Sequence, residues 1–270
     1  MIDQLIQRGR APLFVIAGPC VIESLELCLE VGRHVKGVCE RLGLAYVFKA
    51  SFDKANRSSN ASFRGPGLEG GLKILERIKS ELNVPVLTDV HETHHAEAAG
   101  KVVDVLQVPA FLARQTDLLL ACGWTGKVVN VKKGQFMAPA EMKLAVEKIR
   151  STGNENIMLT ERGTFFGYGR LVNDFTGLAV MKTFGCPVVF DVTHSTQQPA
   201  GMGNQSGGNP QYSPLLARAA VVAGVDGLFL ECHPEPKKAK SDAATMLGLD
   251  EVEPLLTQCK QLADLRRTWG

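Results

Sequence analysis

Basic residues lie at or just after the ends of short apolar segments along this 270-residue chain. Lys49 in "YVFKAS" and Lys132 in "VNVKKG" stand inside apolar runs, so they must point into a polar cavity, because burying an unpaired ammonium is strongly unfavourable. Gathered in one place, such cations lower one another's pKa unless anions fill the space between them. The pattern predicts binding of multiply charged substrates, with Arg as a planar fork for phosphate or carboxylate and Lys as a point charge. The set is Lys49, Lys54, Arg57, Arg114, Lys132, Lys133 and Arg162.

A second set combines residue types that bind metal ions, namely Cys20, His194, Glu231 and Asp242. A thiolate, an imidazole and two carboxylates make a donor set of borderline softness, which suits Zn²⁺, Fe²⁺, Co²⁺ or Mn²⁺ better than Mg²⁺. Taken singly, each residue also has a structural interpretation, because a lone cysteine is usually a packing residue and a lone histidine is usually hydrogen-bonded. Whether the four meet depends on the fold.

The elements that must position these residues are short apolar runs rich in Val, Ile, Leu and Phe, separated by stretches with helical periodicity. The runs do not alternate strictly between apolar and polar residues, which is typical of strands buried on both faces. Strands are expected at 13–20, 45–51, 85–91, 104–111, 128–134, 157–163, 187–194 and 227–233. Helices are expected at 24–42, 67–82, 138–151, 213–224 and 250–269.

Eight strands alternating with helices predict an α/β fold, a single-domain (β/α)8 (TIM) barrel over residues 1–270, with residues 1–12 as an N-terminal extension. A doubly wound open sheet is the runner-up, but it would usually have fewer strands and a Gly-rich fingerprint in its first turn, where this chain has "AGPC". The irregular, Gly-rich stretch 196–212 is long enough to be a functional loop, and we consider it as a lid.

In such a barrel the active site lies at the carboxyl ends of the strands. Closure would place the last strand beside both the first and the seventh, so Cys20, His194 and Glu231 would lie close together, and Asp242 on the next loop could reach them. The fold therefore converts four scattered residues into one predicted metal site.

Bulk composition excludes several classes of protein. The formal net charge of +2 is nearly balanced, which argues against a nucleic-acid footprint or a polybasic membrane surface. No apolar run approaches a membrane span, and the first dozen residues lack the apolar core of a signal peptide. The seven cysteines are scattered and include no CxxC, which indicates reduced thiols and a cytoplasmic protein.

The motif "FKASFDKANRSS" at 48–59 makes the sequence similar to the 3-deoxy-D-manno-octulosonate 8-phosphate synthases, also named 2-dehydro-3-deoxyphosphooctonate aldolases. The resemblance covers nearly the whole chain and includes "IAGPCVIES", "TDVHE", "QVPAFLARQTDLL", "NVKKGQF", "LTERGTFFGY", "FDVTHS" and "ECHPEP". It implies a transferase that joins phosphoenolpyruvate, D-arabinose 5-phosphate and water into the octulosonate 8-phosphate and inorganic phosphate, for lipopolysaccharide biosynthesis. The alternative is the related heptulosonate 7-phosphate synthase, which uses erythrose 4-phosphate and resembles K-P-R-T-S where this chain has "KANRSS".

The resemblance also implies roles for particular residues. Those expected to bind phosphoenolpyruvate are Lys49, Lys54, Gln107, Lys132 and Arg162. Those expected to bind arabinose 5-phosphate are Asn56, Arg57, Ser58 and Arg114, with Arg114 reaching a neighbouring subunit because the family is tetrameric. Those expected at the reacting centre are Lys54, Asp89, His194 and Cys20.

The family has a metal-dependent version and a version that has Asn where the first strand ends and needs no metal. Cys20 at that position implies the metal-dependent version, with one divalent transition metal per subunit bound by Cys20, His194, Glu231 and Asp242. Since the metal-free version also carries the His, Glu and Asp, Cys20 alone separates the two.

Other hypotheses stay open at this level. Each basic residue other than Lys49 and Lys132 could be a solvated loop charge paired with Asp or Glu. Lys49 or Lys132 could form a Schiff base in an aldolase of another kind. A sugar-phosphate sensor without catalysis is a third reading, although a sensor has no need of four convergent metal ligands.

Overall fold

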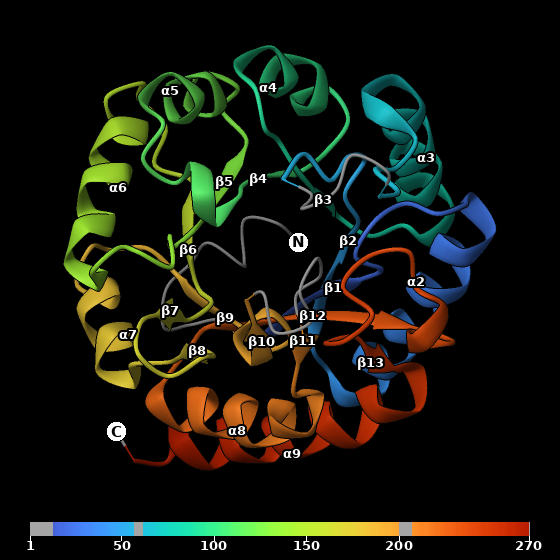
Figure 1. The fold of residues 1–270 in the computed structure, drawn as a ribbon, viewed down its shortest axis with the longest axis vertical. Helices are drawn as coiled ribbons and strands as arrows, with labels where there is room; N and C mark the ends of the chain where they lie inside the picture. The colour runs from blue at the N-terminus through green and yellow to red at the C-terminus, as the bar shows by residue number, and fades with distance from the viewer. Residues whose placement is uncertain (1–12, 57–61, 200–206, 270) are drawn as a thin grey trace.

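Strand β1 pairs with β2 on one side and with β12 on the other, and this second pairing closes the sheet into a barrel (Figure 1). The computed structural model describes residues 13–56, 62–199 and 207–269. Within these ranges eight parallel strands form the barrel: β1 (Phe14–Gly18), β2 (Ala45–Lys49), β3 (Val86–Asp89), β4 (Val105–Val108), β5 (Val128–Lys132), β6 (Ile157–Glu161), β9 (Val188–Asp191) and β12 (Gly227–His233). The predicted single-domain α/β barrel is confirmed, while the predicted extension 1–12 lies outside the described residues.

Helices surround the barrel, and α8 and α9 lie side by side along one edge of it (Figure 1). They are α2 (Leu25–Leu42), α3 (Gly67–Leu82), α4 (Thr93–Gly100), α5 (Thr116–Trp124), α6 (Met142–Arg150), α7 (Phe175–Lys182), α8 (Ser213–Ala223) and α9 (Leu249–Arg267). Helix α2 shows why the sequence begins a helix there: the Ser24 hydroxyl accepts a hydrogen bond from the backbone N–H of Leu27, and Gly43 ends the helix in a left-handed conformation.

Two apolar cores follow from the alternation of side chains along the strands. Phe14 and Ile16 point into the barrel, whereas Val15 and Ala17 pack between the strands and the helices. Where β1 ends, a Cβ on Gly18 would lie 2.0 Å from the carbonyl oxygen of Lys49, so only glycine permits this close approach of β1 and β2. That approach brings the backbone of Cys20 within reach of the Lys49 side chain.

Three helices were not among those expected from periodicity. Helices α5, "TDLLLACGW", and α7, "FTGLAVMK", carry few polar residues and therefore show no polar face in the sequence. Helix α4 has only 8 residues, which is too short for a clear periodic pattern. Pro254 is the sixth residue of α9 and so lies beyond its first turn.

The strands are shorter than the apolar runs, and the loops contain structure of their own. Strand β9 ends at Asp191, so His194 begins a 3-10 turn and does not lie in a strand. The helix expected over 138–151 is a 3-10 turn at Pro139–Glu141 followed by α6. Short pairings extend the loops: β7 (Thr164–Phe165) with β8 (Leu171–Val172), β10 (Gln197–Gln198) with β11 (Gly207–Gly208), and β13 (Leu247–Gly248) with β12.

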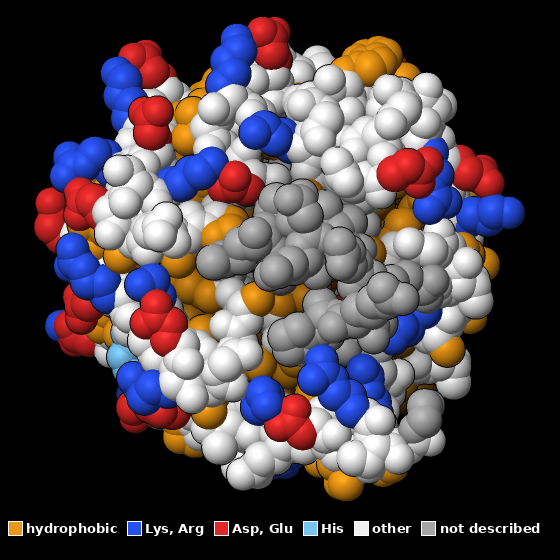
Figure 2. Space-filling view, turned by 180° about the vertical axis from the view of Figure 1, so that it is seen from behind, with side chains coloured by type: hydrophobic (Ala, Val, Ile, Leu, Met, Phe, Trp, Pro, Cys, Tyr) orange, Lys and Arg blue, Asp and Glu red, His pale blue; other side chains and the backbone are white. Residues whose placement is uncertain are grey.

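On the face shown in Figure 2, Lys and Arg side chains alternate with Asp and Glu around the rim, as expected from the nearly balanced charge. All seven cysteines are free and buried. Among the described residues, no helix has both the length and the apolar character needed to cross a membrane.

A belt of hydrogen-bonded polar side chains crosses half of the barrel near the carboxyl ends of its strands. Ser51 donates to Asp89, Gln107 donates to Asp89, Asn130 donates to Gln107 at 2.8 Å, and Thr160 donates to Asn130 at 2.7 Å. Each member is buried. Since each buried polar group has a partner from the next strand, the belt fixes which face these side chains present to the barrel mouth.

Asp89 accepts hydrogen bonds from two members of this belt, Ser51 and Gln107, and its charge depends on nearby lysines. Burial alone would raise the pKa of Asp89, but Lys49 and Lys54, followed by Lys132, hold it well below its usual range. A depressed carboxyl pKa stabilises the fold above the unfolded value of about 3.9, and this contribution is lost as the pH falls below that value.

We therefore expect Asp89→Asn to reduce the free energy of unfolding at pH 7 by about 2 kcal/mol, the typical value of a hydrogen bond to a charged group. The difference in unfolding free energy between the variant and wild type should shrink as the pH falls below about 4, because the stabilising contribution of the ionised wild-type carboxyl is lost there. Urea unfolding between pH 7 and pH 3 measures the loss of stability at pH 7 and its dependence on pH. The exposed Asp117→Asn is the control, with a change of less than about 0.5 kcal/mol at each pH. A difference that stays constant across this range would contradict the proposed charge of Asp89.

Candidate active site

Lys49 and Lys132 end strands β2 and β5, and both are buried with carboxylate partners. Lys49 donates to Glu231 and, at 2.8 Å, to the carbonyl oxygen of Cys20. Lys132 donates to Asp191 at 2.6 Å. The prediction that both lysines point into a polar cavity is confirmed by these contacts, which reach across one intervening strand to β12 and to β9.

The ring of Phe229, on the inner face of β12, supports both ammonium groups. The Lys132 Nζ lies 3.9 Å from the centre of the ring, and the Lys49 Nζ lies 5.5 Å from it. An aromatic face attracts a cation without carrying a countercharge. The ring therefore stabilises the two lysines in addition to their carboxylate partners, without adding a further negative charge to the site.

Asp191 connects the lysines with the predicted metal ligands, a role that the sequence did not reveal. One of its oxygens accepts from Lys132, while the other lies 3.0 Å from both the backbone nitrogen and the ring Nδ1 of His194. Burial alone would raise the pKa of Asp191, but His194 and Lys132 hold it well below its usual range. The position of Asp191 at the end of an apolar run was the available signal, but its partners depend on the fold.

Barrel closure brings three of the predicted metal ligands together. Gly18 of β1 is the register partner of Glu231 in β12, and Cys20 follows two residues later. Ligand atoms of Cys20, Glu231 and Asp242 all lie within 4.8 Å of one another, and the Cys20 Sγ is 3.0 Å from the Asp242 Oδ2.

His194 supplies the fourth donor to the same place. Its Nε2 lies 3.5 Å from the Glu231 Oε2 and 3.7 Å from the Asp242 Oδ2. Because Asp191 can only accept, the ring Nδ1 carries a proton and the Nε2 faces the two carboxylates. A carboxylate that orients a histidine in this way is a common partner of metal-binding imidazoles.

The donor set fits a cation. The Glu231 Oε2 is buried and has no hydrogen-bond partner in the described ranges, although buried carboxylate oxygens are normally satisfied. Burial, followed by the charges of Asp242 and Glu231, raises the pKa of the Cys20 thiol well above its usual range. A divalent cation among these donors would satisfy the unpaired oxygen and reverse the effect on the thiol.

Polar contacts hold the segment after β12 against the end of β1. The Cys20 thiol lies 3.1 Å from the buried Ser241 hydroxyl, and Glu23 accepts from the backbone N–H of Lys240 at 2.9 Å. Asp242 itself has a φ of 49°, a left-handed conformation that non-glycine residues seldom adopt outside turns and functional sites.

His233 contacts the loop that follows it. Its Nδ1 accepts from the backbone N–H of Glu235 at 2.9 Å, and its Nε2 lies 3.7 Å from Glu23. These contacts place it with the backbone of "HPEP". Cys232, the preceding residue, packs in the outer core against the helices.

Lys54 and Arg162 complete the positive side of the site. Burial alone would lower the pKa of Lys54, but surrounding negative groups, led by Cys20 and Glu231, raise it. Arg162 is buried, and burial lowers its pKa. Its Nη1 has no hydrogen-bond partner among the described residues, and the neighbouring Lys133 has its Nζ 3.7 Å from Glu161.

The remaining predicted substrate residues are not part of this cluster. Asn56 and Arg114 are exposed, and the Arg114 side chain has no ion-paired partner among the described residues. Arg114 borders a hollow of about 400 Å³ that is also lined by Met137 and Leu144. Arg57 and Ser58 lie outside the described residues.

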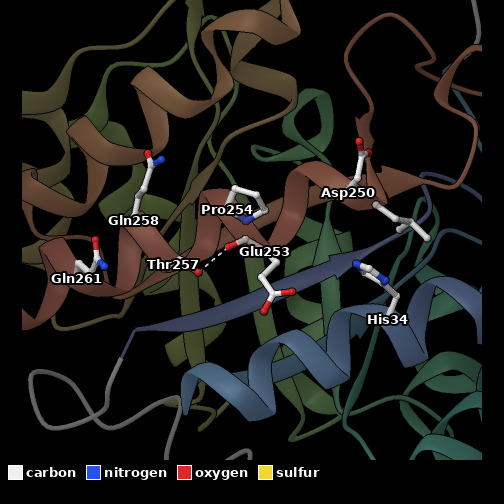
Figure 3. Close-up of a pocket in the computed structure, with 8 residues that line it drawn as sticks. His34, Asp250, Glu253, Pro254, Thr257, Gln258 and Gln261 are labelled. Atoms are coloured by element: carbon white, nitrogen blue, oxygen red, sulfur yellow. Dashed lines mark hydrogen bonds between the residues drawn. The ribbon is translucent and has the colours of Figure 1, made fainter.

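A larger hollow, of about 590 Å³, lies on the outer surface between α2 and α9 (Figure 3). His34 of α2 and residues of α9 such as Glu253 line it, and the Thr257 hydroxyl donates to the Glu253 carbonyl oxygen. None of its lining residues belongs to the predicted site.

Comparisons with known proteins identify the family. Residues 2–268 match the model of the DAHP synthetase I family. Two relatives named 2-dehydro-3-deoxyphosphooctonate aldolase, from Stenotrophomonas maltophilia (strain R551-3) and Xanthomonas campestris pv. campestris (strain B100), are each 54% identical over 96% of this chain and 94% of their own. A third of the same name, from Thioalkalivibrio sulfidiphilus (strain HL-EbGR7), is 54% identical over 96% of this chain and 92% of its own. The chain therefore belongs to the DAHP synthetase I family and, within it, to the 2-dehydro-3-deoxyphosphooctonate aldolases.

Proposed function

We propose that this protein is a transferase that condenses phosphoenolpyruvate with D-arabinose 5-phosphate and water, giving 3-deoxy-D-manno-octulosonate 8-phosphate and inorganic phosphate. The observation that carries this is the group of buried cations at the barrel mouth, where Lys49, Lys132 and Arg162 converge and the Arg162 Nη1 has no partner. Such a cluster is stabilised by anionic substrates. The names of the relatives favour the octulosonate product over the heptulosonate alternative.

The residue roles follow the expectations from the sequence. Phosphoenolpyruvate binds the buried cations and the belt, through Lys49, Lys54, Gln107, Lys132 and Arg162. Arabinose 5-phosphate binds the loop after β2 and a neighbouring subunit, through Asn56, Arg57, Ser58 and Arg114. Lys54, Asp89, His194 and Cys20 surround the reacting atoms. The raised pKa of Lys54, to which the nearby acidic groups of Cys20, Glu231 and Asp89 contribute, supports its central position.

The reaction joins two molecules that carry charge of the same sign. C3 of phosphoenolpyruvate attacks the aldehyde carbon of the sugar phosphate, and water adds to C2. The resulting hemiketal phosphate then loses inorganic phosphate through cleavage of the C–O bond. The buried cations hold both substrates in register and stabilise developing negative charge, which are the main sources of catalysis here.

Mixing the wild-type protein with both substrates tests the function. We expect inorganic phosphate and the eight-carbon product to form together, and much less product with erythrose 4-phosphate. Phosphate release without a new sugar acid, or a preference for erythrose 4-phosphate, would contradict the proposal. Trapping of a covalent adduct by borohydride would favour a Schiff base on Lys49 or Lys132, and no turnover with either sugar would favour a sensor.

We infer that the site binds one divalent transition metal per subunit, such as Zn²⁺, Fe²⁺, Mn²⁺ or Co²⁺, through Cys20, His194, Glu231 and Asp242. The Glu231 Oε2 has no hydrogen-bond partner among the described residues, and ligand atoms of Cys20, Glu231 and Asp242 lie within 4.8 Å of one another. The His194 Nε2, 3.5 Å from Glu231 and 3.7 Å from Asp242, adds a fourth donor, and together these observations support the inference. When bound, the ion supplies orientation of the aldehyde or the water, and Lewis acidity. Because relatives of the metal-free version carry out the same condensation, orientation of the aldehyde or the water is the larger part of what the ion contributes to catalysis.

Metal removal tests this inference. A strong chelator should abolish most of the activity, and stoichiometric Co²⁺ should restore it together with a thiolate-to-metal absorption band. Cys20→Asn should lack that band and give a weak enzyme that chelators do not affect. Cys28→Ala, which changes a buried thiol of α2, is the control and should keep both the band and the sensitivity to chelators. Full activity of the stripped wild-type protein would refute the metal requirement.

We further infer a homotetramer in which Arg114 reaches a neighbouring site. The loops after β4, β5 and β6 expose large apolar side chains, Phe111, Phe136, Phe165, Phe166 and Tyr168, although exposed aromatic groups are usually scarce on a monomer. Arg114 is exposed beside them and makes no ion pair among the described residues.

Mixing two inactive variants tests whether Arg114 acts between subunits. Arg114→Ala and Lys132→Met should each be nearly inactive. After the two are unfolded and refolded together, mixed tetramers contain sites with an intact Lys132 and a neighbour's intact Arg114, so activity should return. If the mixture stays as inactive as the separate variants while forming tetramers, Arg114 serves its own subunit.

We place the enzyme in the cytoplasm as one catalytic domain of 270 residues, with residues 1–12 as an N-terminal extension. Seven free thiols support a reducing compartment. Cell fractionation that recovered the protein outside the cytoplasm would contradict this location.

A further inference from the structure

Within the part of the chain that the structure describes, the guanidinium of Arg162 has one side-chain partner. Its Nη2 donates to the Gln197 Oε1 at 2.6 Å, while its Nη1 is buried and has no hydrogen-bond partner there. The group is planar and rigid, so fixing one of its nitrogens also restricts the direction in which the other points. Gln197 therefore determines where the unpaired Nη1 donor can be used.

The acidic residue next to Arg162 is occupied by other contacts. Glu161 accepts from the backbone N–H groups of Arg162 and Gly163, at 2.9 and 2.6 Å, and lies 3.7 Å from the Lys133 Nζ. Within residues 13–56, 62–199 and 207–269, no carboxylate forms a salt bridge with the Arg162 guanidinium. Its partner is thus a neutral amide, which orients the group without cancelling its charge.

Gln197 is itself held in place by the short ribbon of β10 and β11. Gln197 pairs with Gly208, and the backbone N–H of Asn209 donates to the Thr196 carbonyl oxygen at 3.0 Å. A Cβ on Gly208 would lie 2.3 Å from the Thr245 Cγ2 and 2.8 Å from the Ala244 carbonyl oxygen. The ribbon therefore packs directly on the backbone of the segment after β12.

That segment carries Asp242, one of the proposed metal ligands. The backbone N–H of Thr245 donates to the Asp242 carbonyl oxygen at 3.0 Å, and the Thr245 hydroxyl donates to the same oxygen at 3.2 Å. Gly208 contacts Thr245 on its other side. A continuous path of contacts thus runs from Arg162 through Gln197 and the ribbon to Asp242.

We propose that Gln197 is a positioning residue for the condensation: it fixes the Arg162 guanidinium, with its full charge, for the phosphate group of phosphoenolpyruvate. The inference rests on the proposed function for the identity of the anion. A neutral acceptor is required, because a carboxylate at this place would occupy the guanidinium as an ion pair and repel the incoming phosphate.

Three variants separate positioning from a merely structural contact. Gln197→Glu keeps the shape and the acceptor but adds a charge, whereas Gln197→Leu removes the acceptor without adding one. Gln198→Glu is the matched control, because it makes the same charge change on the next residue of β10, whose side chain points to the opposite face. Thermal unfolding of each variant shows whether the fold is retained.

The measurements are calorimetric affinities for phosphoenolpyruvate and for inorganic phosphate, and the KM values of both substrates. Gln197→Glu should weaken binding of phosphoenolpyruvate and of phosphate by at least about tenfold, as a new charge a few Å from the anion requires. Gln197→Leu should weaken both by about three- to tenfold, the usual effect of losing a hydrogen bond to a charged group. The KM for arabinose 5-phosphate should change much less than the KM for phosphoenolpyruvate.

Unchanged anion affinity in a folded Gln197→Glu protein would overturn the proposal, as would an equal loss in Gln198→Glu. An equal rise of both KM values would also overturn it, because it would indicate a general disturbance of the site. If the wild-type protein forms no octulosonate product, the proposed function fails, yet the binding of phosphoenolpyruvate and phosphate still decides the role of Gln197.

Discussion

Burial of two lysines in one barrel mouth is the constraint on which the site depends. Lys49 and Lys132 are almost fully enclosed, and each is stabilised by a carboxylate from the next strand but one around the barrel. Those same carboxylates also serve the metal-type cluster, since Glu231 faces His194 and Asp191 orients its ring. The lysine half of the site and the half with the proposed metal ligands therefore share their acidic residues.

Sharing makes the two halves interdependent. A change at Glu231 would leave Lys49 buried without a partner and would remove a donor from the cluster at the same time. Such unpaired buried charges are among the most destabilising changes known in proteins. The Phe229 ring relieves part of this demand, because it stabilises both ammonium groups without a further carboxylate.

The sequence was sufficient for the barrel and for the meeting of the donors, because both follow from simple rules. Apolar runs of strand length alternate with helices, and closure of eight such units brings the end of the first strand beside the last. It was insufficient where partners depend on side-chain direction. Asp191 and Gln197 were visible as polar residues after an apolar run, but only the folded chain shows that one orients His194 and the other Arg162. Helices α5 and α7 escaped periodicity because their sequences lack a polar face.

The pairing of β1 with β12 has a consequence for the synthesis of the chain. Cys20 emerges among the first residues, whereas Glu231 and Asp242 emerge near the end, and the three become neighbours only when the sheet closes. A nascent chain that stops short of β12 lacks both closure and the late donors. The same backbone hydrogen bonds that finish the barrel thus finish the donor cluster, so occupancy by a metal ion would report that the last strand has joined the first.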